Sequence, residues 1–158
     1  SADPHSIDRI FLVRNIVFAA LCATLPTLAA AEVMVSDPWA RASILANRPG
    51  AAYLTLESDI ADRLMSLGTP VAGQVMLHGT ETDANGVARM AHIEALDIEP
   101  GTPVTFAPGG MHLMLMGLTG KLAEGSTFPL TLSSQHAGDI TVDVQVLGIA
   151  ATGPKGTE

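Results

Sequence analysis

Glycine and proline interrupt the chain at short intervals after its first thirty residues, and this leaves little room for helices. The sequence holds 15 Gly and 10 Pro in 158 residues, and short segments of alternating apolar and polar residues lie between them. Alternation with a period of two is typical of half-buried strands. We therefore expect a chain of strands, at residues 32–36, 50–57, 62–67, 74–80, 86–95, 103–106, 112–118, 127–133 and 140–147.

Two segments predict tight turns between these strands. Residues 83–86 read Asp-Ala-Asn-Gly, and an Asn-Gly pair favours a hairpin turn because both residues tolerate a positive φ angle. Residues 108–110, Pro-Gly-Gly, are a second turn signal. Short strands at this spacing are typical of a Greek-key β-sandwich. The predicted fold is all-β, in one domain over residues 32–149 with a flexible tail at 150–158.

The N-terminal segment has the pattern of a secretory signal peptide. Arg9 and Arg14 precede an apolar run at 16–25, and an Ala-x-Ala site ends near Ala31. The run is short and rich in small residues, which disfavours the alternatives of a membrane anchor or a buried helix. We expect residues 1–31 to be cleaved off, after Ala31 or Ala30. Leu21 is too bulky to precede a lipid-modified Cys22, so no lipid anchor is predicted.

The charge balance narrows the possible partners. Lys and Arg total 8 against 16 Asp and Glu, a formal charge of −8. Such a chain repels phosphate backbones and anionic lipid surfaces. We expect no nucleic-acid partner and no stable membrane insertion after signal cleavage.

Cysteine is absent from the expected mature domain. The single Cys of the sequence, Cys22, leaves with the signal. A cysteine-free exported domain suits an oxidising compartment, where free thiols form disulfides. Zinc fingers, iron–sulfur clusters and blue-copper sites all need thiolates, so these sites are excluded.

Histidine and methionine recur together on three of the expected strands. Residues two apart on a strand lie on the same face, so each segment offers an imidazole and a thioether on the same side. Imidazole plus thioether, without carboxylate or thiolate, is a soft donor set that favours Cu(I) over zinc, calcium or magnesium. Methionine also fills apolar cores, and a single pair would favour packing. The three segments are Met76–His78, Met90–His92 and His112–Met116.

The spacing of four of these residues resembles a known family signature. His78 and Gly79 are followed after ten residues by Met90, and after twenty-one more by His112 and Met114. This is similar to the pattern of the periplasmic PCu(A)C copper chaperones, in which Gly79 occupies an optional Met position. The resemblance covers roughly residues 33–147. Further blocks that resemble the family are Asp-Pro-Trp-Ala-Arg at 37–41, Ala-Ala-Tyr-Leu-Thr-Leu at 51–56, Pro-Gly-Gly-Met-His-Leu-Met-Leu-Met-Gly-Leu at 108–118 and Leu-Ala-Glu-Gly at 122–125.

The resemblance implies a cupredoxin-like β-sandwich that binds one Cu(I) per chain through His78, Met90, His112 and Met114. It also implies a copper chaperone in the periplasm. The implied recipient is a haem–copper (cytochrome c) oxidase, at the dinuclear copper site of subunit II. Another periplasmic copper chaperone is the alternative partner.

The chain also departs from the family pattern. Residues 148–158 contain neither His nor Met, so we expect no second copper site in the tail. His92 shares the face of Met90 without being a family ligand, which leaves a surrogate or outer-shell role open beside that of a surface residue. His136 is interpreted as a turn residue. We interpret the remaining residues as packing or structural: Met76, Met111, Met116, Trp39 and Arg41.

Other functions stay open at this stage. An exported copper-sequestering or homeostasis protein would use the same ligands, and a structural β-sandwich would use none. No Gly-x-Ser-x-Gly, His-Glu-x-x-His or Walker A pattern occurs, and we do not expect an enzyme.

Overall fold

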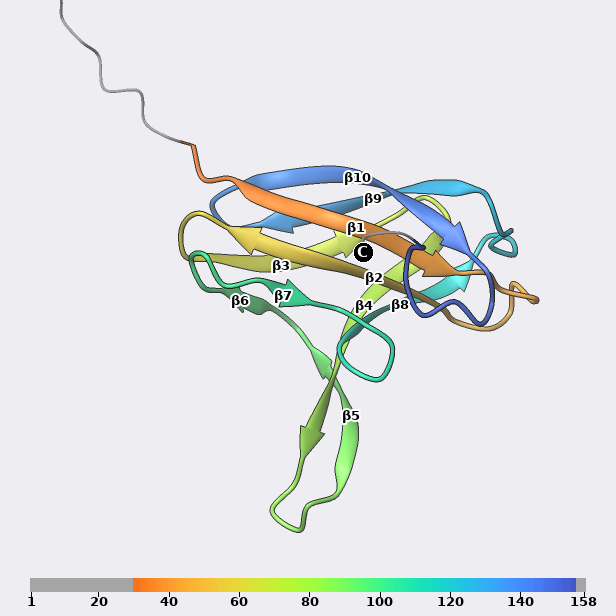
Figure 1. Cartoon of the computed structure of the whole chain (residues 1–158), viewed down its shortest axis with the longest axis horizontal. Coiled ribbons are helices and arrows are strands. Elements are labelled where there is room, and N and C mark those ends of the chain that lie inside the picture. The colour runs from red at the N-terminus through yellow and green to blue at the C-terminus, as the bar shows by residue number, and fades with distance from the viewer. Residues whose placement is uncertain (1–29, 156–158) are drawn as a thin grey trace, which may run out of the picture.

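A computed structural model describes residues 30–155 as ten strands joined by turns, with no helix among these residues. The predicted all-β class is confirmed (Figure 1). The strands are β1 (Val33–Arg41), β2 (Gly50–Ser58), β3 (Asp62–Gly68), β4 (Ala72–Thr82), β5 (Ala88–Ile93), β6 (Leu96–Ile98), β7 (Val104–Thr105), β8 (His112–Leu118), β9 (Thr127–Ser134) and β10 (Gly138–Leu147). The predicted signal peptide at 1–31 falls almost entirely outside the described residues. Within residues 30–155 the structure has no helical segment with the length and hydropathy of a membrane span.

The strands form one mixed sheet that folds over itself into two layers. Its order is β5-β4-β8-β2-β1-β10-β9-β3-β6, and β7 pairs with β2. Strands β1 and β10 pair in parallel, whereas the other pairs are antiparallel. Strands that are distant in the chain lie side by side, with β8 beside β2 and β10 beside β1, as expected for a Greek-key β-sandwich.

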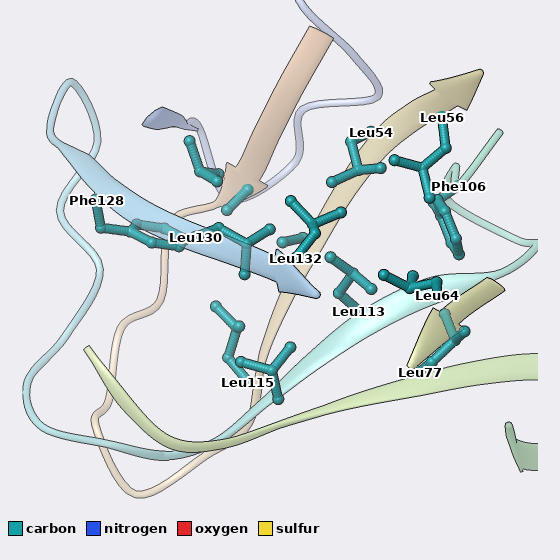
Figure 2. Close-up of a cluster of buried hydrophobic side chains, with 14 of the residues drawn as sticks. Leu54, Leu56, Leu64, Leu77, Phe106, Leu113, Leu115, Phe128, Leu130 and Leu132 are labelled. Atoms are coloured by element: carbon teal, nitrogen blue, oxygen red, sulfur yellow. The ribbon is translucent and has the colours of Figure 1, made fainter. Parts of the chain in front are cut away.

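Leucine side chains from both layers meet in the core. Leu54 of β2 and Leu113 and Leu115 of β8 point toward Leu130 and Leu132 of β9 (Figure 2). These five residues are at most 2% exposed. Because alternate residues of a strand face opposite sides, the residues between these leucines must point away from the core. This second set includes the His and Met residues of β8, and the same alternation on β4 places Met76 and His78 outside the core.

The first strand runs further than the sequence predicts. The expected strand ends at residue 36, before Asp37 and Pro38, but β1 continues to Arg41. A register shift between Ser36 and Trp39 lets it do so, with Asp37 at φ 49°. Such a bulge absorbs the extra residue and lets pairing with β2 resume.

Beyond the bulge, Trp39 packs on Tyr53 on the outer face of β1 and β2. Their ring centroids are 4.5 Å apart, and both residues are 4% exposed. The Arg41 guanidinium lies 5.9 Å from the Tyr53 ring centroid. The Arg41 Nε–H also donates to the Ala151 carbonyl at 2.9 Å, so the start of the C-terminal tail contacts β1. The structural role expected for Trp39 and Arg41 is consistent with these contacts.

Asp62 ties the first residues of β3 to the turn that follows β9. Its carboxylate accepts hydrogen bonds from the peptide N–H groups of Arg63, His136 and Ala137, at 2.7 to 3.0 Å. Burial alone raises the pKa of this carboxyl, but the three donors outweigh it and the pKa is lowered. The folded protein therefore favours the ionised form more strongly than the unfolded chain does.

We expect the variant Asp62→Asn to lose about 1.5–3 kcal/mol of unfolding free energy at neutral pH, since hydrogen bonds to a charged acceptor contribute about that much. A lowered folded-state pKa means that this stability is present above the unfolded pKa and lost as pH falls through the folded one. Urea unfolding at pH 7 and at several acidic pH values measures both effects. Equal loss of stability at acidic pH in the variant and the wild type would show that Asp62 is not the cause of that loss.

Candidate metal centre

A projecting hairpin carries half of the predicted ligands. The first part of β4 pairs with β8 inside the sandwich, and its last part pairs with β5 alone. The β4–β5 hairpin therefore extends beyond the body of the sandwich (Figure 1). Its turn is the predicted one: the Asp83 carboxylate accepts from the N–H groups of Asn85 and Val87, and Gly86 has φ 79°.

Alternation separates ligand-type residues from core residues on both β4 and β8. On β4, Val75, Leu77 and Gly79 are buried, while Met76 and His78 on the other face are half-buried. On β8, Leu113 and Leu115 are fully buried, and the alternate residues His112, Met114 and Met116 are half-buried. The outer face of these strands thus presents side chains of His and Met: His112, Met114, Met116, Met76 and His78.

The strand register places histidines directly opposite one another. His78 pairs with His112 of β8 on one side and with His92 of β5 on the other. The His78 and His112 ring centroids are 5.6 Å apart, and those of His78 and His92 are 5.9 Å apart. His78 lies at the point where β4 leaves the sandwich, so this histidine row lies at the rim of the sandwich.

The ring nitrogens of His78 and His112 differ in their hydrogen bonding. The Nε2 atom of His78 is buried and has no hydrogen-bond partner among residues 30–155. A buried polar atom without a partner costs about 1–3 kcal/mol, so such atoms often mark binding sites. The Nδ1 of His112 lies 3.3 Å from the Gly110 carbonyl. Donation by Nδ1–H to this carbonyl would leave Nε2 of His112 as the free lone pair.

Burial disfavours the protonated form of the His78 imidazole. Its pKa is lowered from the ordinary value, first by burial and then by the nearby charges that His112 and His92 carry when protonated. Only the neutral imidazole offers a lone pair to a metal ion. The environment of His78 therefore favours the form that can bind a metal.

The two predicted methionine ligands flank this row. Met114 pairs across the strands with Met76, one step from His78 toward the body of the sandwich. Met90 pairs with Thr80, one step from His78 toward the hairpin turn. The Met90 side chain is 58% exposed, and its sulfur lies 3.9 Å from the Thr80 hydroxyl oxygen. All four predicted residues share one face, and their role as ligands stays a prediction.

Comparisons with known proteins establish the family of the chain. The family described as putative lipoprotein LpqE-like matches residues 33–146. The chain belongs to the LpqE-like family, a PCuAC-type family. This LpqE-like chain is also 30% identical to a putative lipoprotein of Leifsonia xyli subsp. xyli, over 78% of its own length and 75% of the relative's.

Solved structures that this LpqE-like chain resembles include PCuAC domains. The apo PCuAC domain of PmoF2 superimposes with a TM-score of 0.65 at 26% identity, covering 80% of this chain and 98% of that domain. The copper-bound form of the PmoF2 domain gives a TM-score of 0.63 at 26% identity, with coverages of 76% and 96%. The Cu(I) form of DR1885 from Deinococcus radiodurans gives 0.53 at 32% identity, with coverages of 81% and 83%. The predicted PCu(A)C resemblance and the cupredoxin-like β-sandwich are confirmed.

Other residues singled out from the sequence separate into two groups. Met76 and Met116 lie on the face of His78, whereas Met111 packs against the hydrophobic core. Gly79 also faces the core: a Cβ atom there would lie 2.7 Å from Cδ1 of Ile93. A methionine at this optional family position would therefore point away from His78.

His92 and His136 have different surroundings. His136 follows β9, and its peptide N–H donates to Asp62, so the turn position predicted for it is observed. His92 lies beside His78 in the histidine row, which sequence spacing alone could not establish because the pairing of β4 with β5 and β8 decides it.

Proposed function

We propose that this domain is an exported Cu(I) chaperone that binds one copper ion per chain and hands it to an acceptor protein. The buried, unpartnered Nε2 of His78 beside His112, on a face that also holds Met114 and Met90, is the observation that carries the proposal. The copper-bound PCuAC domain of PmoF2 and the Cu(I) form of DR1885 support it.

The donor set selects the metal ion. Two imidazoles and two thioethers are neutral donors, and soft sulfur donors favour Cu(I), whereas zinc, calcium and magnesium favour harder or charged ligands. Residues after the predicted cleavage site include no Cys, so every sulfur donor of the exported chain is a thioether. A thioether cannot be lost to a disulfide in an oxidising compartment, although it can become a sulfoxide.

The position of the site suits transfer of copper rather than catalysis. The histidine row lies at the rim of the sandwich, and the exposed Met90 is within reach of another protein. Neutral ligands hold copper less tightly than thiolates do, so a thiolate-containing acceptor can take the ion. We propose that the protein is not an enzyme, because copper is its cargo and a four-ligand shell leaves no open position for a substrate.

The proposal also names the compartment of the protein and the acceptor of its copper. The signal-like segment before Ala31 and the lipoprotein names of the relatives support export, and we place the protein in the periplasm. As acceptor we propose the dinuclear copper site of a haem–copper oxidase subunit II, whose thiolates would draw Cu(I) from this site.

Transfer to that acceptor is directly measurable. We expect the Cu(I)-loaded chain to pass its copper to a purified, copper-free subunit II domain, until most of the copper is recovered with the acceptor after separation. A subunit II variant without its copper-binding cysteines serves as the control and is expected to receive none. Retention of copper by the chain with both acceptors would contradict delivery and favour sequestration.

A further inference from the structure

A third imidazole adjoins the proposed copper site. His92 of β5 lies opposite His78, on the side away from His112, so three histidines on three adjacent strands form one row. Both ring pairs are edge-to-face, with interplanar angles of 73° and 64°. His92 is not one of the four residues in the family spacing and has no role in Cu(I) binding as proposed above.

Three imidazoles suit a different oxidation state of copper. Cu(II) prefers nitrogen and oxygen donors in a tetragonal arrangement, and thioethers bind it weakly. The pair His78 and His112 would supply only two nitrogen donors to Cu(II). With His92 the set becomes three nitrogens, and one water oxygen completes four positions.

The strand geometry allows this arrangement after a side-chain rotation. Neighbouring strands lie about 4.8 Å apart, so a metal ion above His78 on the central strand is within reach of a histidine on either side. No three His, Cys, Asp or Glu side chains already converge on one point in residues 30–155. His92 is exposed on an edge strand, so it can change rotamer without disturbing the core.

We propose that His92, together with His78 and His112, binds Cu(II) on this face, so that the domain accepts copper in either oxidation state. The proposal rests on the proposed copper site and extends it. No electron transfer is involved: Cu(I) uses the methionine side of the row, and Cu(II) uses the His92 side.

Pulsed electron paramagnetic resonance of the exported chain with one equivalent of Cu(II) tests this directly. We expect three coordinated imidazoles in the wild type and two in His92→Gln, with a Cu(II) affinity at least about tenfold lower in the variant. The Cu(I) affinity of His92→Gln should match that of the wild type, since the four proposed Cu(I) ligands remain. The control is His136→Gln, which alters an exposed histidine elsewhere and should leave both affinities unchanged.

The possible failures are distinguishable. Wild-type binding of Cu(I) together with an identical Cu(II) spectrum in His92→Gln would overturn the role of His92 and leave the proposed function standing. Binding of neither ion by the wild type would overturn both proposals.

Discussion

Replacing His78 with alanine is expected to lower the Cu(I) affinity of the domain by roughly 100-fold or more, equivalent to about 2.8 kcal/mol of binding free energy. His78 is the central member of the histidine row and pairs with both neighbouring strands. Its Nε2 atom is buried and has no hydrogen-bond partner among residues 30–155, so its loss removes a donor that no other protein group uses. Competition with a chromophoric Cu(I) chelator measures the affinity.

The control for this experiment is His136→Ala, since His136 lies on the turn after β9. It should bind Cu(I) as the wild type does. A loss of copper by His136→Ala, with copper retained by His78→Ala, would show that the ligands are assigned to the wrong face of the molecule.

Leu113→Ala is expected to have a large effect on the stability of the domain and not on its copper binding. Leu113 lies between His112 and Met114 on β8, points into the core and is 0% exposed. Removing a buried leucine side chain leaves a cavity and costs about 2–5 kcal/mol of unfolding free energy. Urea unfolding of the apo-protein measures the loss, and the variant should still bind one Cu(I) where it is folded.

The variant His112→Ala tests the alternation of core and outer residues on β8 at a residue of the outer face. His112 is half-buried on the outer face, so its loss should change apo stability by only about 0.5 kcal/mol while it weakens Cu(I) binding. If His112→Ala unfolded the apo-protein as strongly as Leu113→Ala does, the outer face would be part of the core and the site would be misplaced.

Local patterns were enough to predict most of the strands. The alternation at 112–118 and the Asp-Ala-Asn-Gly turn at 83–86 depend on neighbours in sequence, and both are observed. The extension of β1 past Pro38 was missed, because pairing resumes with β2 beyond the bulge at Asp37, and the local sequence around Pro38 does not show this pairing. The expected strand at 86–95 is in fact the shorter β5, and the chain then leaves it to form β6 against β3.

The candidate site was predictable only in part, for a related reason. Spacing of two along β8 puts His112 and Met114 on one face, and the family resemblance supplied His78 and Met90. Which residues face each other across strands is a matter of register, set by long-range pairing and core packing. That is why the position of His92 beside His78 emerged only from the fold.

X-ray absorption spectroscopy at the copper edge, on the exported chain loaded with one Cu(I), identifies the atoms that bind the copper ion. We expect one tightly held ion with a mixed shell of imidazole nitrogens and thioether sulfurs, since two histidines and two methionines are the proposed ligands. A shell of nitrogen and oxygen without sulfur, or a chain that retains no copper after desalting, would contradict it.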